Sequence, residues 1–339
     1  MQAKTKRPFG RTGLEVTAMS FGAAPIGNFL KPIDEEVAKA MVDAAWDAGI
    51  RMFDTSPLYG HGLSELRLGA ALRWRRRDDY VLSTKVGRLL EPAKRETIDY
   101  APWVDAGAFK LRFDYSHDGA MRSIEDSLQR LGLERIDIAL VHDCDRFNFG
   151  DELPEVFETA MNGAAKALLR LRDEGVVKAV GLGVNEWQPC YDALLRHDLD
   201  AFLLAGRYTL LEQESLDPFL ALCAERGAGV IVGGGFNSGI LATGAVPGAK
   251  YNYSPAPEDI VAKVKKIEAV CAEFDVALPA AALQFVTAHP AVPTFCAGTR
   301  NVEQLEQNVA WLEAPIPGDF WQALKARGLL REDAPVPAG

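Results

Sequence analysis

Residues 50–73 read IRMFDTSPLYGHGLSELRLGAALR and contain a strand, a loop and a helix in close succession. Residues 50–53 form a short apolar run, which is typical of a buried strand. Residues 64–73 carry apolar side chains three or four positions apart, which is the spacing of an amphipathic helix. A strand followed at once by a helix predicts a parallel sheet with crossover helices.

The same unit recurs almost from one end of the chain to the other. Seven further β-rich runs occur at residues 16–21, 80–84, 136–141, 179–182, 201–204, 229–232 and 293–296. Helical periodicity occurs in residues 34–48, 119–131, 154–174, 188–196, 215–226, 257–288 and 301–311. Gly49 and Gly132 end two of these helices, and no Pro/Ser/Gly linker divides the chain. We therefore expect one α/β domain over residues 1–339 with eight parallel strands.

Two architectures contain alternating strands and helices, an open doubly wound sheet and a closed (β/α)8 TIM barrel. The open sheet usually carries a G-x-G-x-x-G phosphate loop, but residues 181–183 and 233–235 do not complete that motif. The sequence therefore favours the barrel. Residues 86–117 and 233–257 are long connections that follow strands, so they predict extended loops at the carboxyl-terminal, catalytic face.

The composition excludes several classes of partner. Of 339 residues, 48% are hydrophobic and 25% are charged, which suffices for a substantial core. The net charge of −10 opposes binding to nucleic acids and to anionic membranes. The basic run at residues 73–77 is interpreted as a solvated helix end. We expect a small-molecule partner and a monomer or small homo-oligomer.

The five cysteines are scattered and include no C-x-x-C pair, so reduced thiols are expected rather than disulfides or a zinc site. Residues 142–145, His-Asp-Cys-Asp, are all metal-binding types. Consecutive side chains rarely converge on one ion, however, and no metal is expected. Residues 1–10 lack an apolar signal region, and no apolar run approaches the roughly 18 residues that span a bilayer. These features predict a cytoplasmic protein.

Three polar residues lie at the ends of three consecutive predicted strands, namely Asp54, Lys85 and His142. Neighbouring barrel strands lie about 4.8 Å apart, so these side chains can meet in one small volume. Tyr59 follows in the same loop as Asp54. A nearby ammonium group lowers the pKa of a phenol, so Lys85 is expected to activate Tyr59 as an acid/base, with Asp54 as counter-ion. His142 is suited to hydrogen-bond a substrate oxygen.

Each of these residues also has an ordinary structural interpretation. Asp54 suits a cap before a helix, Lys85 a solvated strand end, and Tyr59 an aromatic packed in a turn. The catalytic interpretation depends on the four residues being taken together.

The joint pattern resembles the aldo-keto reductases, which are NAD(P)-dependent (β/α)8-barrel oxidoreductases. The resemblance covers nearly the whole chain, and its motifs are FDTSPLYG at residues 53–60, SELRLG at 64–69, STKVG at 83–87 and SLQRLG at 127–132. It implies a catalytic tetrad in which Tyr59 is the acid/base, Lys85 and Asp54 tune it, and His142 orients the substrate.

The resemblance also implies how a nicotinamide cofactor binds. Near the nicotinamide and pyrophosphate it implies Asn185, Tyr208, Gly234, Gly235, Phe236, Asn237 and Gly239. Near the adenosine phosphate it implies Gly298, Thr299, Arg300, Gln304, Gln307 and Asn308. Glu186 and Ala205 depart from the family pattern. Family members that favour NADP often carry Lys and Arg at the positions of Gly298 and Gln304, so NAD is favoured, with NADP as the alternative.

Several stretches, including residues 113–119, 181–187, 205–213 and 251–253, are similar to the aldose 1-dehydrogenase branch of this family. That similarity implies oxidation of a sugar hemiacetal at C1 to a lactone. Trp103, Asp143, Asn148 and Trp187 are the candidate substrate contacts. The alternatives are a pyridoxal 4-dehydrogenase, a reductase of small aldehydes, or a non-catalytic nicotinamide-binding regulatory subunit.

Overall fold

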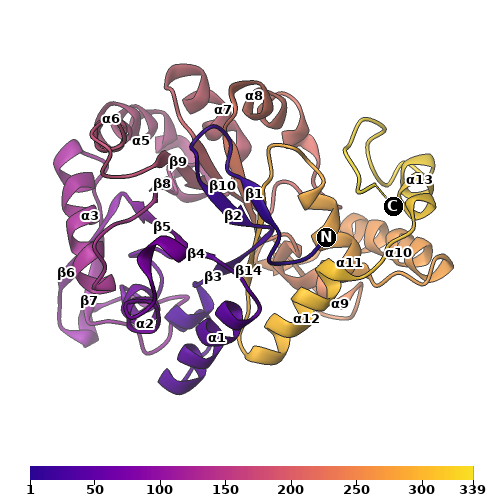
Figure 1. Ribbon diagram of the computed structural model, residues 1–339, viewed down its shortest axis with the longest axis horizontal. Helices are drawn as coiled ribbons and strands as arrows, with labels where there is room; N and C mark the ends of the chain where they lie inside the picture. The colour runs from indigo at the N-terminus through magenta and orange to yellow at the C-terminus, as the bar shows by residue number, and fades with distance from the viewer. Residues whose placement is uncertain (339) are drawn as a thin grey trace.

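The computed structural model describes residues 1–338 and contains a closed barrel of eight parallel strands at its centre (Figure 1). Each strand pairs with the next one along the chain, and the last pairs with the first. The barrel strands are β3 (Met19–Gly22), β4 (Met52–Asp54), β5 (Val81–Val86), β8 (Ile138–His142), β9 (Ala179–Val184), β10 (Ala201–Ala205), β11 (Gly229–Gly233) and β14 (Thr294–Gly298). This order confirms the predicted (β/α)8 barrel.

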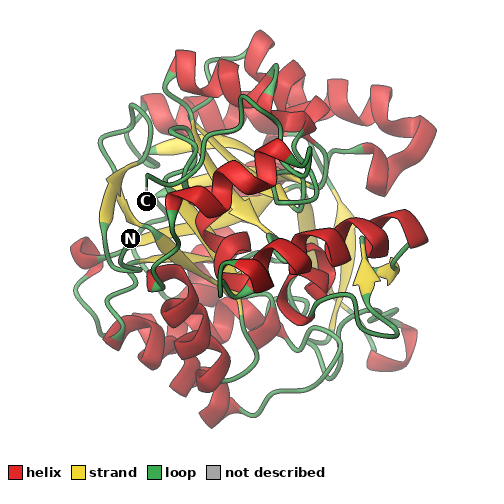
Figure 2. Ribbon diagram, turned by 90° about the vertical axis from the view of Figure 1, so that its right-hand side faces the viewer, coloured by secondary structure: helices red, strands yellow, loops and turns green. Residues whose placement is uncertain are grey.

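Helices form an outer layer around the strands (Figure 2). The longer ones are α1 (Glu35–Asp47), α2 (Leu63–Leu72), α3 (His117–Leu131), α5 (Leu153–Ala160), α6 (Lys166–Asp173), α7 (Trp187–Arg196), α8 (Phe219–Arg226), α10 (Glu258–Glu273), α11 (Leu278–Thr287), α12 (Val302–Glu313) and α13 (Gly318–Ala326). The helix α3 illustrates the expected end signals. Ser116 caps its start by accepting the backbone N–H of Gly119, and Gly132 ends it in the left-handed conformation.

Two predicted helices differ in the structure. Residues 257–288 form two helices, α10 and α11, which meet at an angle of 99°. The break contains Asp275 with a φ of 54°, and Pro279 starts the second helix, so neither residue can continue the first. Residues 154–174 are interrupted by a π-helical turn at Met161–Ala165. The periodicity did not predict α13 at all.

The amino-terminal end of the barrel is closed by an antiparallel hairpin of β1 (Lys6–Pro8) and β2 (Glu15–Thr17) (Figure 1). The ring of Phe9 packs on Gly229 at the start of β11, where an added Cβ would lie only 2.8 Å from the ring. Val16 belongs to the same apolar cluster as the inward-facing strand residues. The predicted strand at residues 16–21 is therefore corrected. Its first residues belong to β2 of the hairpin, and the barrel strand β3 begins only at Met19.

The two long connections lie at the opposite, carboxyl-terminal end of the strands. The first contains the antiparallel pair β6 (Arg88–Pro92) and β7 (Phe109–Phe113). The second contains the short helix α9 (Ile240–Thr243) and a small hairpin of β12 (Lys250–Tyr251) and β13 (Ser254–Pro255). Phe147 of the short helix α4 (Arg146–Phe149) and Tyr253 of the second connection line a pocket at this end of the barrel.

Two smaller predictions concern the helices and the cysteines. Within residues 1–338, no single helix is long and apolar enough to cross a membrane. Only the bent pair of α10 and α11 reaches that length and composition jointly. The five cysteines are buried and free, as expected for thiols outside a disulfide framework.

His289 generates a prediction about stability and pH. Its ring is buried against Tyr208, and its Nδ1 accepts the backbone N–H of Ala291 at 3.1 Å. Burial lowers the pKa of His289 to about 4 from an ordinary value of 6.5, so its stabilising contribution is complete above pH 6.5 and is lost as the pH falls toward 4. Urea unfolding measures the free energy of unfolding at pH 7 and at pH 4.5. The drop between these two pH values should be about 2 kcal/mol smaller in His289→Gln than in the parent protein. His117→Gln, at an exposed site, is the control and should keep the parental pH slope.

Candidate active site

A buried ion pair lies at the open end of the barrel. Lys85 Nζ, on β5, donates to Asp54 Oδ2 at the end of β4 over 2.7 Å and to the carbonyl of Thr55 over 2.8 Å. The exposed fractions of Lys85 and Asp54 are 1% and 2%. Gly183 on β9 leaves room for the lysine, because a Cβ there would lie 3.3 Å from Lys85 Cε. The two charges are thus held in place by adjacent barrel strands.

Tyr59 lies above this pair, in the loop between β4 and α2. Its ring centroid is 4.9 Å from Lys85 Nζ and 5.9 Å from the ring centroid of His142. The loop is held by close backbone contact between Gly27 and Gly60, where any added Cβ would come within 3 Å of backbone atoms. Asp54, Tyr59, Lys85 and His142 therefore come together, as the sequence predicted.

The predicted lowering of the Tyr59 pKa is wrong. Burial raises the pKa of Tyr59 well above its ordinary value of 10, and the negative charges of Asp54 and Asp143 raise it further. The ammonium of Lys85 does not reverse this effect, since its charge is compensated by Asp54 at 2.7 Å. The phenol is consequently protonated at neutral pH.

His142 ends β8 and is held on two sides. Its Nδ1 lies 3.1 Å from the hydroxyl of Ser56, in the loop that carries Tyr59, and its carbonyl accepts the hydroxyl of Tyr115 at 2.7 Å. Burial lowers the pKa of His142 well below its ordinary range, and the positive charges of Arg88 and Lys85 lower it further. The imidazole is therefore neutral and can hydrogen-bond an oxygen without carrying a charge.

A second buried ion pair lies beside the imidazole. Arg88 Nη2 is 2.8 Å from Asp143 Oδ2, and Asp143 Oδ1 is 3.5 Å from His142 Nε2. Sequence reasoning proposed Asp143 but missed Arg88. The available signal was an arginine three positions after Lys85, separated from it by Gly87. Gly87 has a φ of 106°, which turns the chain from β5 into β6 and leads Arg88 back toward the site.

The other three predicted substrate contacts lie in different surroundings. The ring centroid of Trp103 is 5.6 Å from that of Tyr59, so this side chain is part of the site. The amide of Asn148 instead donates to Asp145 Oδ1 at 2.7 Å, inside the cap of α4. Trp187 starts α7, and its buried Nε1 has no partner among the described residues. Both the backbone N–H and the side-chain amide of Asn148 therefore bond to the capping residue Asp145, and the side chain is engaged in local structure.

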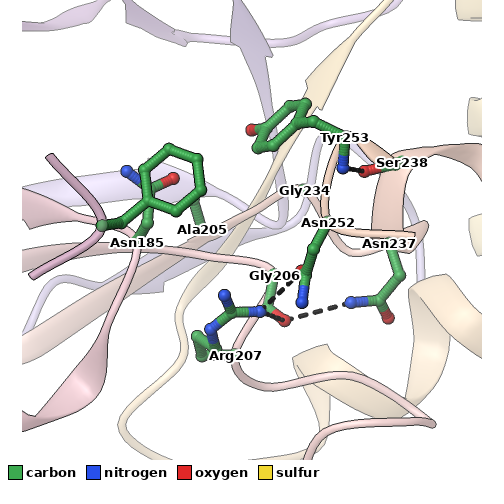
Figure 3. Close-up of a pocket in the computed structure, with 10 residues that line it drawn as sticks. Asn185, Ala205, Gly206, Arg207, Gly234, Asn237, Ser238, Asn252 and Tyr253 are labelled. Atoms are coloured by element: carbon green, nitrogen blue, oxygen red, sulfur yellow. Dashed lines mark hydrogen bonds between the residues drawn. The ribbon is translucent and has the colours of Figure 1, made fainter. Parts of the chain in front are cut away.

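A pocket opens beside these residues, at the carboxyl ends of β9, β10 and β11 (Figure 3). Gly206 and Gly234 contribute to its lining without side chains, and Asn185 and Arg207 contribute polar side chains. The complete lining comprises Phe147, Asn185, Ala205, Gly206, Arg207, Gly234, Asn237, Ser238, Asn252 and Tyr253. Asn185, Gly234 and Asn237, three of the predicted cofactor contacts, line this pocket.

Three other predicted contacts support the pocket from behind. Tyr208 is fully buried, with its ring 5.1 Å from that of Phe285. The ring of Phe236 packs against Phe295, and Gly235 fits closely against the same Phe295 side chain. Tyr208 therefore does not line the pocket in this structure, and its direct contact with a cofactor stays a prediction.

Asn237, in the connection after β11, is hydrogen-bonded to the connection after β10. It has a φ of 45°, its Oδ1 accepts the hydroxyl of Thr209 at 2.6 Å, and its Nδ2 donates to the carbonyl of Gly206 at 3.0 Å. Gly239 has a φ of 105° and precedes α9. Figure 3 shows Asn237 in the pocket lining, with its amide directed at the carbonyl of Gly206.

The start of α12 has the features of an anion site. Asn301 caps this helix through the N–H of Gln304, and Gln304 Oε1 accepts the N–H of Arg300, both at 2.9 Å. Within residues 1–338, Thr299 Oγ1 and Arg300 Nη1 are buried without hydrogen-bond partners. Donors of this kind at the positive end of a helix fit a phosphate group. Gly298 and Gln307 are exposed, and Asn308 is buried in the helix.

A closed parallel barrel with a phenol, an ammonium–carboxylate pair and an imidazole beside such a pocket is the architecture of a barrel oxidoreductase. The sequence pattern of the Aldo/keto reductase family matches residues 18–327, and the chain belongs to this family. It is accordingly an NAD(P)-dependent enzyme of the class that acts on small carbonyl substrates.

Two relatives are similar over 97% of this chain and 99% of their own length. Identity is 44% with pyridoxal 4-dehydrogenase from Microbacterium luteolum and 37% with D-threo-aldose 1-dehydrogenase from a Pseudomonas species. Among solved structures, the holo form of an aldo-keto reductase from Bacillus halodurans has a TM-score of 0.72 at 27% identity. That match covers 98% of each chain.

The buried Lys85–Asp54 pair leads to a test of its stability. Lys85→Met leaves the Asp54 carboxylate buried without its counter-ion, which should lower the free energy of unfolding by about 3 kcal/mol. Adding Asp54→Asn removes the uncompensated charge and should recover at least about half of that loss. Urea unfolding of both variants checks this, and equal loss in the two would contradict it. As a control, Lys39→Met breaks the exposed pair with Asp43 and should cost less than about 1 kcal/mol.

Proposed function

We propose that this protein is an NAD-dependent dehydrogenase that oxidises pyridoxal at its 4-carbonyl group. The observation that carries the proposal is the 44% identity with a pyridoxal 4-dehydrogenase, compared with 37% for a D-threo-aldose 1-dehydrogenase over the same share of the chain. This order reverses the sequence-based expectation, in which an aldose was the first choice.

Aromatic side chains around the site support a planar substrate. Trp103 lies against Tyr59, and the rings of Phe147 and Tyr253 are 6.2 Å apart at the edge of the neighbouring pocket. A pyridine ring that packs against such side chains buries apolar surface. An aliphatic sugar makes less use of these side chains.

The two candidate substrates share one reaction. In water, pyridoxal closes through its own hydroxymethyl group to a cyclic hemiacetal, as an aldose does through a chain hydroxyl. Oxidation transfers a hydride from the hemiacetal carbon to NAD and releases the proton of its hydroxyl, giving a lactone and NADH. The cofactor supplies the hydride acceptor, and the protein must hold the substrate and take the proton.

The residues around Tyr59 suit this proton transfer. The phenolate form of Tyr59 accepts the hydroxyl proton, while the neutral imidazole of His142 donates a hydrogen bond to the same oxygen. Lys85, held by Asp54, stabilises the phenolate when it forms. Because burial raises the pKa of Tyr59, oxidation by this route is faster at alkaline pH.

Preference for NAD is supported by residues near α12. Gln304 takes part in the cap of α12, Gly298 has no side chain, and Glu303 and Glu306 place negative charge on the same helix. Only Arg300 offers a cation in residues 298–308. A ribose 2′-phosphate therefore finds one charge-assisted contact at most in this segment, which disfavours NADP.

An aldose is the second candidate substrate. The 37% identity with D-threo-aldose 1-dehydrogenase favours it, as do Asp143 and Asn185, which place polar groups suited to hydroxyls next to His142. Simple aldehydes lack those hydroxyls and make less use of the polar groups.

A substrate panel with both cofactors tests the proposed function. Pyridoxal, L-fucose, D-arabinose and L-galactose are each offered with NAD and with NADP while NADH or NADPH absorbance is followed. We expect the highest kcat/KM for pyridoxal, with NAD favoured over NADP by about tenfold, the value of one charge-assisted contact. Oxidation of a sugar but not of pyridoxal would overturn the first choice in favour of the second.

Tyr59→Phe tests the proton transfer. Turnover should fall by at least about 10²-fold with the affinity for NAD nearly unchanged, since only the hydroxyl is removed. In the parent enzyme, oxidation should rise with pH above neutrality because the phenolate becomes more populated, and this rise should vanish in the variant. Stopped-flow turnover and fluorescence titration of NAD measure the two quantities. Normal turnover in Tyr59→Phe would exclude Tyr59 as the base.

A further inference from the structure

We propose that Arg88 and Asp143 together recognise a free hydroxyl group near the reacting carbon, so that the substrates are hydroxyl-bearing hemiacetals rather than simple aldehydes. This inference rests on the proposed function of the same site. It assigns a substrate-binding role to Arg88, which neither the sequence motifs nor the catalytic tetrad include.

Arg88 has one N–H group, Nη1, that no acceptor among the described residues engages. Its side chain is only 6% exposed, and its guanidinium lies over the ring of Phe113 at 4.5 Å from the centroid. Nη2 is paired with Asp143, whereas Nη1 is buried without a hydrogen-bond partner anywhere in residues 1–338. Burying a charged N–H donor without an acceptor is costly, so this donor is suited to an oxygen that arrives with the ligand.

Asp143 supplies the complementary acceptor. One oxygen, Oδ2, is engaged by Arg88 at 2.8 Å. The other, Oδ1, has two long contacts only, 3.5 Å to His142 Nε2 and 3.4 Å to Asn185 Nδ2. These distances are at the limit for a hydrogen bond, so Oδ1 can accept a shorter bond from a ligand.

Arg88 Nη1 and Asp143 Oδ1 are the remaining polar atoms of one ion pair, and a hydroxyl group offers both an acceptor and a donor. A hydroxyl accepts one hydrogen bond and donates another, so it can accept from Arg88 Nη1 and donate to Asp143 Oδ1. A hydrogen or methyl group at this position would leave both partners unsatisfied. The contact of Asp143 with His142 places this recognition beside the group that faces the reacting oxygen.

Both candidate substrate classes carry such a group. Pyridoxal has a hydroxyl on the ring carbon next to the one that bears the carbonyl, and an aldose has one at C2. A site that reads a hydroxyl discriminates strongly against analogues without it, because its buried partners are then unpaired. The Arg88–Asp143 pair thus explains how one site suits both classes.

The experiment compares pyridoxal with 3-deoxypyridoxal, and an oxidised aldose with its 2-deoxy analogue. In the parent enzyme, kcat/KM for the deoxy compound should be at least about tenfold lower. In Arg88→Met this ratio should fall below about threefold, while Arg112→Met, which changes an exposed arginine on β7, should keep the parental ratio. Using the ratio cancels the intrinsic reactivity of each compound.

A second variant and a second readout keep the test decisive. Asp143→Asn, which keeps the shape of the side chain, is the second variant and should also reduce the ratio. Calorimetry of the binding of pyridoxal and of 3-deoxypyridoxal to the parent protein measures discrimination without turnover, so an error about the reaction is distinguishable from an error about this pair. Equal losses for hydroxyl and deoxy compounds in Arg88→Met, or equal binding of both by the parent, would overturn the inference.

Discussion

The ion pair between Lys85 and Asp54 is the contact around which the open end of the barrel is organised. Two opposite charges buried at 2.7 Å tolerate little displacement, since separation would leave each of them unpaired in a dry environment. Adjacent strands fix their backbones, and Gly183 on the next strand but one leaves space for the lysine side chain. The Tyr59 loop then lies directly above this pair because Gly27 and Gly60 allow close backbone contact.

Burial and two ion pairs together set the pKa values of the phenol and the imidazole in the site. Two buried ion pairs, Lys85 with Asp54 and Arg88 with Asp143, lie next to the phenol of Tyr59 and the imidazole of His142. Burial is the largest cause of the pKa shifts of Tyr59 and His142, and single charges of these pairs add to it. Burial raises the pKa of the phenol and lowers the pKa of the imidazole, and both groups are therefore uncharged at neutral pH. Two uncharged hydrogen-bonding groups next to fixed dipoles suit a site where charge develops only during reaction.

Different connections contribute residues to the surroundings of Tyr59 and to the neighbouring pocket. The connection after β5 supplies Arg88 and Trp103 to the substrate side, and the connection after β11 supplies Asn237 and Tyr253 to the pocket beside it. The barrel strands carry Asp54, Lys85 and His142, whereas Tyr59, Trp103 and most of the pocket lining lie in the connections. This arrangement explains how relatives with different substrates share one family of barrels.

The sequence by itself determined the barrel and the four residues at its mouth. Strand and helix periods are local properties, and the ends of consecutive parallel strands must lie side by side, so Asp54, Lys85 and His142 were predictable. Tertiary structure alone decided the pKa of Tyr59, because burial raises it most and the charges of Asp54 and Asp143 raise it further. The tertiary structure also buries Tyr208 in the core. It pairs Arg88 with Asp143, which lies 55 positions further along the chain. Packing and charge depend on which segments meet in space, and a linear pattern of residues does not contain that information.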